Sequence, residues 1–353
     1  MGFIGVSATL PVMSKHTKLY ETVSALLTPG KGILAADESD GTAGKRLSQV
    51  HLPNEPDNRR AFREILFTAT DIEEYLSGVI MYDSSIRNET KDGMPFIDVL
   101  LAKGIVPGIK VDTGTRQLHG FAGEVVTQGL DGLDERFAEY FDMGARFAKW
   151  RAVITIADDM PSDACIDMNV MQMARYAQYA QAAGLVPIVE PEVLLTGTHD
   201  IVRAEQVTAR VLQRLFHVLQ QQAVDLEGLI LKSSMVLAGD GYPETSTPAE
   251  VANATLRTFH VSVPHTVGGI VFLSGGQTPK RATENLQAVA ELGEQPWPIT
   301  FSYSRAIEEP VLATWQGQEE NIPEAQKMLY HAVKMNGLAQ QGKYDSKKDR
   351  KLT

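Results

Sequence analysis

Cysteine, basic charge and long apolar runs are scarce in this chain of 353 residues. Cys165 is the single cysteine, which excludes an internal disulfide and is typical of a reducing compartment. The net charge of -11 argues against nucleic acid and anionic membrane surfaces as partners. No apolar run reaches the length of a membrane span, and the opening MGFIGVSATLPVM has no basic region. We therefore expect a cytoplasmic protein.

Metal-ligand spacing and a glycine-rich nucleotide turn are also missing. The histidines show no paired spacing at strand ends, which disfavours a metal-dependent enzyme; they are His16, His51, His119, His199, His217, His260, His265 and His331. The turn after the first apolar run reads DESDGTAGKR, whereas a dinucleotide-binding sheet needs a glycine-rich turn there. No linker divides the chain, so we expect one domain over residues 1–353.

Short apolar runs alternate with amphipathic stretches along the whole chain. Strands are predicted at 30–37, 77–85, 104–112, 147–156, 184–192, 227–234, 268–276 and 298–305, and helices at 58–76, 133–145 and 204–224. This alternation predicts a single (β/α)8 TIM barrel. We add an N-terminal helical extension, a long C-terminal helix and a mobile tail at 342–353. An open doubly wound sheet with a helical appendage is the alternative.

Charged residues lie at or near the ends of several predicted strands. In a barrel these ends face the active site, and charges are costly to bury without a partner or a chemical role. We expect one rim to carry Asp37, Asp83, Lys110, Lys149, Glu190, Lys232, Ser274 and Arg305. Taken singly, each could instead form a local ion pair.

This mixture of amines and carboxylates suits Schiff-base chemistry on a carbonyl. A lysine must be neutral to act as a nucleophile, and a cationic neighbour with partial desolvation favours the neutral amine. Lys149 is the candidate neighbour for Lys232. A carboxyl such as Glu190 would protonate the departing carbinolamine hydroxyl. The resulting iminium withdraws electrons and permits cleavage of a carbon–carbon bond.

Anion-binding groups follow the last two predicted strands. LSGGQTPK offers backbone amides at Ser274, Gly275 and Gly276 before a helix, and Arg305 follows the eighth strand. Barrels often bind phosphate with these two loops and a helix N-terminus. Lys45 and Arg46 after the first strand suggest a second anion site. For SGG alone, an ordinary turn is the alternative.

Ordered motifs along nearly the whole chain resemble class I fructose-bisphosphate aldolases. They are GKGILAADES, GIKVD, TQGLDGL, FAKWR, VPIVEPE, LILKSSM, FLSGGQ and TFSYSR. The resemblance implies a (β/α)8 homotetramer of glycolysis and gluconeogenesis that acts on phosphorylated ketose and triose substrates. It also implies no metal and no cofactor, because the electron sink is a covalent Schiff base.

The resemblance also assigns roles to individual residues. Lys232 resembles the Schiff-base lysine, Glu190 the acid/base, Asp37 the base for the substrate hydroxyl, and Lys149 the lysine that holds substrate and tunes the amine. Ser274, Gly275, Ser302 and Arg305 match positions around one phosphate, and Ser39, Thr42, Arg46 and Lys110 match positions toward the other. The expected substrate-binding set is completed by Arg151, Glu192 and Gly276.

Three departures from the family pattern stand out. LKSSM replaces the common LKPNM, so Ser233 and Ser234 follow the Schiff-base lysine. SYSR replaces SYGR, so Ser304 stands where a glycine is usual near the phosphate. Many members end in an aromatic residue that helps to protonate the enamine, but this chain ends KKDRKLT, with Tyr344 as the nearest tyrosine. We expect this basic end to be solvated and without a catalytic part.

Two other functions remain open from the sequence. A Schiff-base aldolase for a monophosphate or for sedoheptulose bisphosphate would keep the lysine and change the second anion site. A catalytically idle barrel acting as a binding protein would be expected to lose one of the four catalytic groups, and all four are present.

Overall fold

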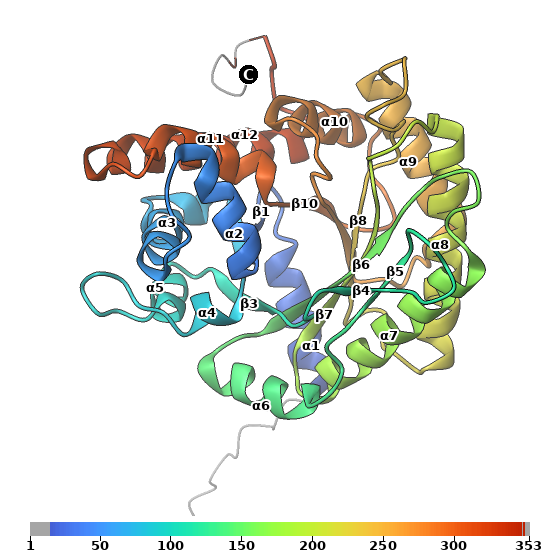
Figure 1. Cartoon of the computed structure of the whole chain (residues 1–353), viewed down its shortest axis with the longest axis horizontal. Helices are drawn as coiled ribbons and strands as arrows, with labels where there is room; N and C mark the ends of the chain where they lie inside the picture. The colour runs from blue at the N-terminus through green and yellow to red at the C-terminus, as the bar shows by residue number, and fades with distance from the viewer. Residues whose placement is uncertain (1–14, 348, 350–353) are drawn as a thin grey trace, which may run out of the picture.

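Eight parallel strands close into a barrel in the computed structural model, which describes residues 15–347 and 349 (Figure 1). In chain order the barrel strands are β1 (Gly32–Ala36), β2 (Leu76–Met81), β3 (Val106–Lys110), β6 (Phe147–Ile154), β7 (Val186–Val193), β8 (Ile230–Ser233), β9 (Gly269–Phe272) and β10 (Ile299–Tyr303). All eight predicted strands are present and β1 pairs with β10. The TIM barrel is confirmed and the open sheet is excluded.

Helices surround the barrel on the outside (Figure 1). They are α1 (Lys15–Leu26), α2 (Asp40–Leu47), α3 (Pro56–Thr68), α4 (Asp83–Ile86), α5 (Phe96–Ala102), α6 (Leu133–Met143), α7 (Asp163–Ala182), α8 (Ile201–Gln221), α9 (Pro248–Ser262), α10 (Pro279–Glu291), α11 (Arg305–Trp315) and α12 (Ile322–Gln340). Short 3-10 helices occur at Ser48–Val50, Ile72–Glu74 and Glu319–Asn321. The expected long C-terminal helix is α12.

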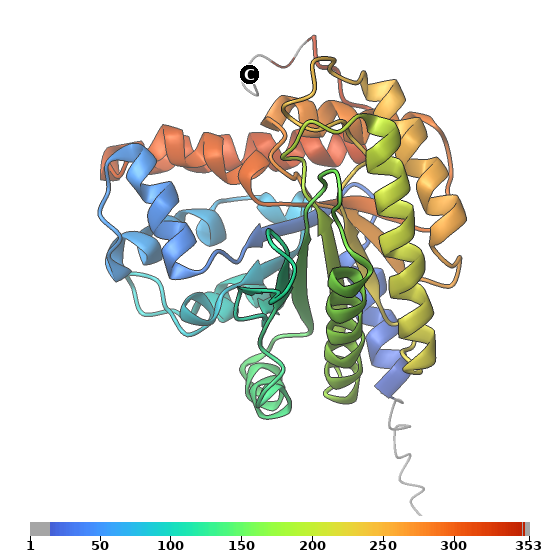
Figure 2. The same ribbon diagram turned by 45° about the vertical axis from the view of Figure 1, so that its right-hand side comes forward.

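Side chains of the strands alternate between the barrel interior and the helix layer, as the two-residue period of a strand requires. The interior cluster contains the strand residues Ile33, Ala35, Ile80, Phe147, Val186, Ile188, Ile230 and Val271. Leu19, Val23 and Leu26 of α1, and Leu27 just after it, belong to the same cluster. Helix α1 therefore packs its apolar face against the interior residues and closes one end of the barrel. Figure 2 shows it, in dark blue, beside the lower ends of the strands.

Phe147 fills the interior where two neighbouring strands carry glycine. A Cβ on Gly108 would overlap the Phe147 ring, and one on Gly78 would overlap Leu26. Because these side chains fill the barrel interior at this end, the interior opens toward the carboxyl ends of the strands in the part of the chain that the structure describes. A second, larger apolar cluster lies between the strands and the outer helices.

Several elements differ from the sequence predictions. The strand predicted at 77–85 ends at Met81, and Asp83–Ile86 forms helix α4. The helix predicted at 58–76 ends at Thr68 and is followed by the 3-10 turn Ile72–Glu74. A small antiparallel hairpin, β4 (Thr115–Gln117) with β5 (Val125–Thr127), follows β3 and was not predicted. Its strands have three residues each, too short to give a clear alternating pattern.

The described part of the C-terminal segment folds back onto the outer helices. Tyr344 is buried, its backbone N–H donates to Gln287 of α10 over 2.9 Å, and its hydroxyl donates to Asp349 over 3.2 Å. Asp349 also lies 3.0 Å from His331 of α12. The expectation of a fully solvated end is wrong at Asp349, whereas the mobility of 342–353 stays a prediction. Residues 348 and 350–353, like residues 1–14 of the N-terminal extension, lie outside the described residues.

Within the described residues, no helix is both long enough and apolar enough to cross a membrane.

Candidate active site

A cavity of about 600 Å³ opens at the carboxyl ends of the barrel strands. Its walls include nearly all the predicted site residues: Asp37, Ser39, Thr42, Arg46, Lys110, Lys149, Arg151, Glu190, Glu192, Lys232, Ser274, Gly275, Ser302 and Arg305. Further wall residues are Glu38, Lys45, Gln49, Asp112, Gly114, Thr115, Ser304 and Glu309. The barrel thus brings together side chains that are up to 268 residues apart in sequence (37 to 305).

The two-residue period explains why these charged side chains point inward. Lys149 follows the interior residue Phe147 by two positions, Glu190 follows Ile188, and Lys232 follows Ile230. Each therefore projects from the same side of its strand as an interior apolar residue. Lys149 is the third residue of β6 and Glu190 the fifth of β7, so the charges lie inside the strands and form the floor of the cavity.

Glu190 bridges two lysines on this floor. Its Oε1 lies 3.1 Å from the Nζ of Lys232, and its Oε2 lies 3.1 Å from the Nζ of Lys149. The Nζ of Lys149 also lies 2.6 Å from Oδ2 of Asp37. Two ammonium groups and two carboxylates thus form a continuous, formally neutral row from Lys232 to Asp37.

Burial and pairing act in opposite directions on this row. Burial alone would raise the pKa of Asp37 and Glu190, but the ammonium groups of Lys149 and Lys232 outweigh it and hold both pKa values below their ordinary range. For Lys149, burial lowers the pKa, but the carboxylates of Asp37 and Glu190 outweigh it and raise the pKa overall. At neutral pH, Lys149 is therefore a cation and both carboxyls are ionised.

Two buried oxygens of the cavity have no hydrogen-bond partner among the described residues: Oε2 of Glu190 and Oγ of Ser302. The contact of Glu190 Oε2 with Lys149 is a charge contact without good hydrogen-bond geometry. Buried polar atoms are rarely left without a partner, so both atoms are suited to bind polar groups of a ligand.

A glycine loop and a helix start lie on one side of the floor, where the sequence predicts an anion site. Gly275 and Gly276 have φ angles of 59° and 91°, which residues with a Cβ rarely adopt. Helix α11 begins directly at Arg305, and Ser302, Ser304 and Arg305 line the same wall. The helix predicted to follow SGG, α10, starts only at Pro279 and is capped by its own Thr278. The helix N-terminus at this site is therefore that of α11.

Paired charges line the wall on the side of β3 and β6. The Nζ of Lys110 lies 3.3 Å from Oδ1 of Asp112 and 5.5 Å from the centre of the Tyr82 ring. The Nε of Arg151 donates to Glu192. Burial lowers the pKa of Arg151, but Glu192 and Glu190 outweigh this and raise it overall.

Arg46 belongs to a largely buried cluster of two arginines and two glutamates. Arg46 contacts Glu38 and Glu308 through Nη1, and Arg63 contacts the same two carboxylates from α3. Burial would raise the pKa of Glu38, but Arg63 and Arg46 outweigh it and lower the pKa, whereas burial and the neighbouring Glu38 raise the pKa of Glu308. The cluster joins the end of β1 to α2, α3 and α11.

Two predicted positions lie off the cavity wall. Asp83 begins α4 and accepts hydrogen bonds from Tyr140 over 2.8 Å and from Arg87 over 2.9 Å; its expected place on the rim is wrong, because β2 ends at Met81 and the chain turns outward there. Gly276 does not line the cavity, and a Cβ there would lie 3.4 Å from the Arg305 guanidinium.

Several cavity residues were missed from the sequence. Glu38 adjoins the predicted residue Asp37, and a search of such neighbours would have found it. Ser304 was noted from the sequence only as a departure from the family pattern, not as a site residue. Asp112 ends the motif GIKVD, and its Oδ2 accepts from the backbone N–H of Arg151 over 3.2 Å. No local pattern marks Glu309 or Gln49, which face the cavity from helix α11 and from the 3-10 turn after α2.

The unusual serines after Lys232 make structural contacts. Ser234 donates its hydroxyl hydrogen bond to the carbonyl of Val193 over 2.9 Å, and Ser233 donates to the carbonyl of Ser234 over 3.0 Å. The Ser234 bond joins the end of β8 to the end of β7, the two strands that carry Lys232 and Glu190, whereas the Ser233 bond stays within the end of β8.

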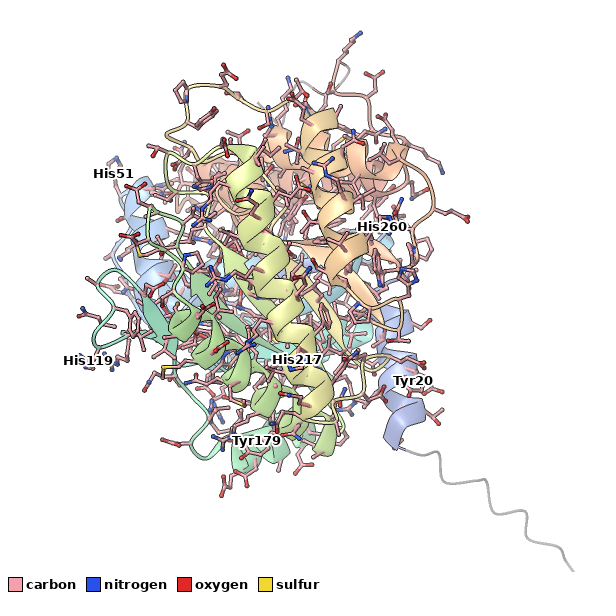
Figure 3. All side chains as sticks on the ribbon, turned by 90° about the vertical axis from the view of Figure 1, so that its right-hand side faces the viewer. Tyr20, His51, His119, Tyr179, His217 and His260 are labelled. Atoms are coloured by element: carbon pink, nitrogen blue, oxygen red, sulfur yellow. The ribbon has the colours of Figure 1, made fainter. Side chains whose placement is uncertain are left out.

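The histidines labelled in Figure 3, His51, His119, His217 and His260, are exposed and spread over the outer surface. In the described part of the chain, no three His, Cys, Asp or Glu side chains are grouped to hold a metal ion.

Comparison with known proteins agrees with the barrel and its cavity. The family model described as fructose-bisphosphate aldolase class-I matches residues 18–353. The chain belongs to the class I fructose-bisphosphate aldolase family. A probable fructose-bisphosphate aldolase class 1 of Xanthomonas campestris is 49% identical over 93% of this chain and 98% of its own length. A cytoplasmic isozyme of Cicer arietinum is 47% identical over 93% of this chain and 92% of its own length.

A solved structure gives the same result for the fold. The fructose-bisphosphate aldolase of Plasmodium falciparum, in a complex with TRAP and a small-molecule inhibitor, superposes with a TM-score of 0.93 at 41% identity. The match covers 98% of this chain and 99% of the other. The barrel fold is therefore shared with this aldolase over nearly the whole length of both chains.

Proposed function

We propose that this chain cleaves fructose 1,6-bisphosphate reversibly into dihydroxyacetone phosphate and glyceraldehyde 3-phosphate through a Schiff base on Lys232. The observation that carries the proposal is Glu190 between Lys232 and Lys149, with contacts of 3.1 Å to each, on the floor of a cavity with anion-binding walls. Family membership supports the substrate class and a place in glycolysis and gluconeogenesis.

Schiff-base formation begins with proton transfer on the cavity floor. The carboxylate of Glu190 accepts a proton from the ammonium of Lys232, and the resulting amine adds to the ketone carbon of the substrate. One proton then passes from the attacking nitrogen to the former ketone oxygen, which gives the neutral carbinolamine. Protonated Glu190 then gives its proton to the carbinolamine hydroxyl, which leaves as water and produces the iminium. Lys149 stays cationic throughout because Asp37 and Glu190 flank it.

Cleavage uses the other end of the charged row. Asp37, ionised at neutral pH, assists removal of the proton from the C4 hydroxyl, the bond between C3 and C4 breaks, and its electron pair moves toward the iminium nitrogen as an enamine. The aldehyde leaves first. Protonation of the enamine at C3 and hydrolysis of the new iminium then release dihydroxyacetone phosphate and restore Lys232.

Substrate phosphates bind on both sides of this floor. One phosphate is bound by Arg305, Ser302, Ser274, Gly275 and the N-terminus of α11. Two observations support this assignment: the Ser302 hydroxyl has no hydrogen-bond partner among the described residues, and the N-terminus of α11 is the positive end of the helix dipole. The other is bound on the side of Ser39, Thr42, Arg46 and Lys110. Arg151, Glu192 and Gly276 complete the binding set, Gly276 by giving the Arg305 guanidinium room.

Three further properties belong to the same proposal. The enzyme works without a metal or a cofactor, because the iminium is the electron sink that a metal would otherwise supply. It forms a homotetramer and acts in the cytoplasm, as the names of several relatives suggest for location. Its net charge of -11 argues against nucleic acid and membranes as partners.

Borohydride trapping tests the proposal directly. Reduction in the presence of dihydroxyacetone phosphate should add mass to the peptide containing Lys232, and cleavage of fructose 1,6-bisphosphate should survive EDTA. Lys149→Arg, which keeps the charge on the floor, should still be labelled at Lys232. Label on Lys110 or Lys149, or activity lost in EDTA and restored by zinc, would contradict the mechanism.

A further inference from the structure

Ser304 lies between the two proposed phosphate sites. It links β10 to α11, lines the cavity, and directly precedes Arg305. Its hydroxyl donates to Oε1 of Glu38 over 2.5 Å and accepts from Nη2 of Arg46 over 2.9 Å. The hydroxyl is thus bonded toward α2, and it links the loop of one phosphate site to the arginine of the other.

Arg46 already has an internal partner on each of its terminal nitrogens. Its Nη1 contacts Glu38 and Glu308, and its Nη2 donates to Ser304. A guanidinium has five N–H groups, and its strongest contact with a phosphate uses two of them in parallel. Ser304 therefore occupies a donor that a phosphate on the α2 side would use.

We propose that Ser304 is a specificity-determining residue, whose hydroxyl holds Arg46 in the cluster with Glu38 and Glu308 and so weakens the binding of a ketose's second phosphate. This inference rests on the function proposed above. It assigns to Ser304 the balance between substrates with two phosphates and substrates with one.

The physical reason is competition for one donor. A phosphate that approaches Arg46 must replace or share the Ser304 hydroxyl, so part of its own hydrogen bond is offset. The side chain of Arg46 is 14% exposed, so without the hydroxyl its Nη2 would have little access to water. Because a buried donor without an acceptor is costly, a phosphate that supplies the acceptor would then bind more tightly.

The test compares Ser304→Ala with Ser304→Thr, which keeps a hydroxyl on the same carbon. Cleavage is measured with fructose 1,6-bisphosphate and with fructose 1-phosphate, which lacks the second phosphate. Ser304→Ala should lower the ratio of the KM for the bisphosphate to the KM for fructose 1-phosphate about three- to tenfold. Ser304→Thr should retain the wild-type ratio of the two KM values.

A double variant separates this role from a general effect on packing. In an Arg46→Ala background, Ser304→Ala should no longer change the KM for the bisphosphate, because the donor for which the hydroxyl competes is gone. Ser304→Gly provides a second removal of the hydroxyl if the alanine variant does not fold, and it should change the KM in the same direction.

Three results would overturn the inference: a KM for the bisphosphate that is unchanged or raised in Ser304→Ala, an equal change for both substrates, or an effect that persists without Arg46. Failure of the wild-type protein to cleave either substrate or to be trapped at Lys232 would instead remove the proposed function, and this inference with it.

Discussion

Replacing Glu190 by glutamine tests the centre of the proposed mechanism. The substitution keeps the size of the side chain but removes its charge and its ability to carry a proton. In the structure both oxygens of Glu190 face lysine ammonium groups, at 3.1 Å each. Glu190→Gln therefore removes the acceptor for the proton of Lys232 and the donor for the carbinolamine hydroxyl in one step.

General acid–base catalysis contributes about 10²- to 10⁴-fold to a rate, equivalent to about 2.7 to 5.5 kcal/mol of activation free energy. We expect kcat of Glu190→Gln to fall within that range. KM should change by less than about threefold, because the proposed phosphate ligands lie on the walls and not on the floor. Borohydride trapping in single-turnover experiments should show that Schiff-base formation has become the slow step.

Two other glutamates serve as comparisons for this substitution. Glu192 lies two residues further along β7 and is also buried, but it pairs with Arg151, so Glu192→Gln should act mainly on KM. Glu205 on α8 pairs with Arg257 on the outer surface, and Glu205→Gln should retain wild-type kinetics. If the kcat of a folded Glu190→Gln protein stays within threefold of wild type, Glu190 does not carry these protons.

Three further outcomes are expected. Arg305→Ala should raise the KM for phosphorylated ketoses about ten- to a hundredfold, because it removes charge-assisted hydrogen bonds worth roughly 1.5 to 3 kcal/mol. An unchanged KM would remove Arg305 from the site. The folded-state pKa of Asp37 is depressed, so the stability that its ionised carboxylate contributes is complete above the unfolded pKa of about 3.9 and is lost as pH falls. In thermal unfolding experiments between roughly pH 5 and pH 2, the melting temperature of Asp37→Asn should therefore fall less steeply with pH than that of wild type. Removing residues 345–353 should change turnover by less than about twofold, or about 0.5 kcal/mol of activation free energy. It should lower the melting temperature, because Tyr344 and His331 lose their contacts with Asp349. A large loss of turnover or of proton exchange at dihydroxyacetone phosphate would show that the tail acts in catalysis.

The barrel could be predicted because strands and helices each give a characteristic spacing of apolar residues in the local sequence. Runs such as GLVPIVEPE carry enough apolar residues to identify a buried strand, and the residue that follows an interior position by two can be assigned to the same side. The sequence placed Lys149, Glu190 and Lys232 together from their positions near strand ends; the two-residue period then explains why they point inward from within the strands. The β4–β5 hairpin could not, because three-residue strands carry too little pattern.

The exact ends of strands and starts of helices account for two of the sequence predictions that the structure corrects. Asp83 resembles the other charged residues that follow strands, but β2 ends two residues earlier and Asp83 bonds Tyr140 outside the cavity. The phosphate loop was assigned to the start of α10, whereas α11 begins at the site. In both cases the deciding fact is where a strand ends and a helix begins, which a pattern gives only to within a few residues.

The balance of charge in the cavity also depends on contacts that only the fold reveals. Lys149 was expected to act on Lys232 as a cationic neighbour, but Glu190 stands between them and the row Lys232, Glu190, Lys149 and Asp37 is formally neutral. The proton that Lys232 must lose therefore has a carboxylate acceptor 3.1 Å away. In the proposed mechanism, the nucleophile is therefore generated by proton transfer between two protein groups rather than by release of a proton to water.

On the walls of the cavity, unlike on its floor, some of the cations have no ion-pair partner among the described residues. Among the described residues, Lys45 and Arg305 line the cavity without an ion-pair partner, whereas Arg46, Lys110 and Arg151 are paired. An unpaired cation offers its full charge to an incoming phosphate, while a paired one must first give up part of its internal contact. We therefore expect Arg305 to supply most of the affinity for one proposed phosphate, and Lys45 to add its unpaired charge to the weaker contribution of the paired Arg46 and Lys110 at the other. In the proposed mechanism the neutral row between the two sites can exchange protons without weakening the binding of either phosphate.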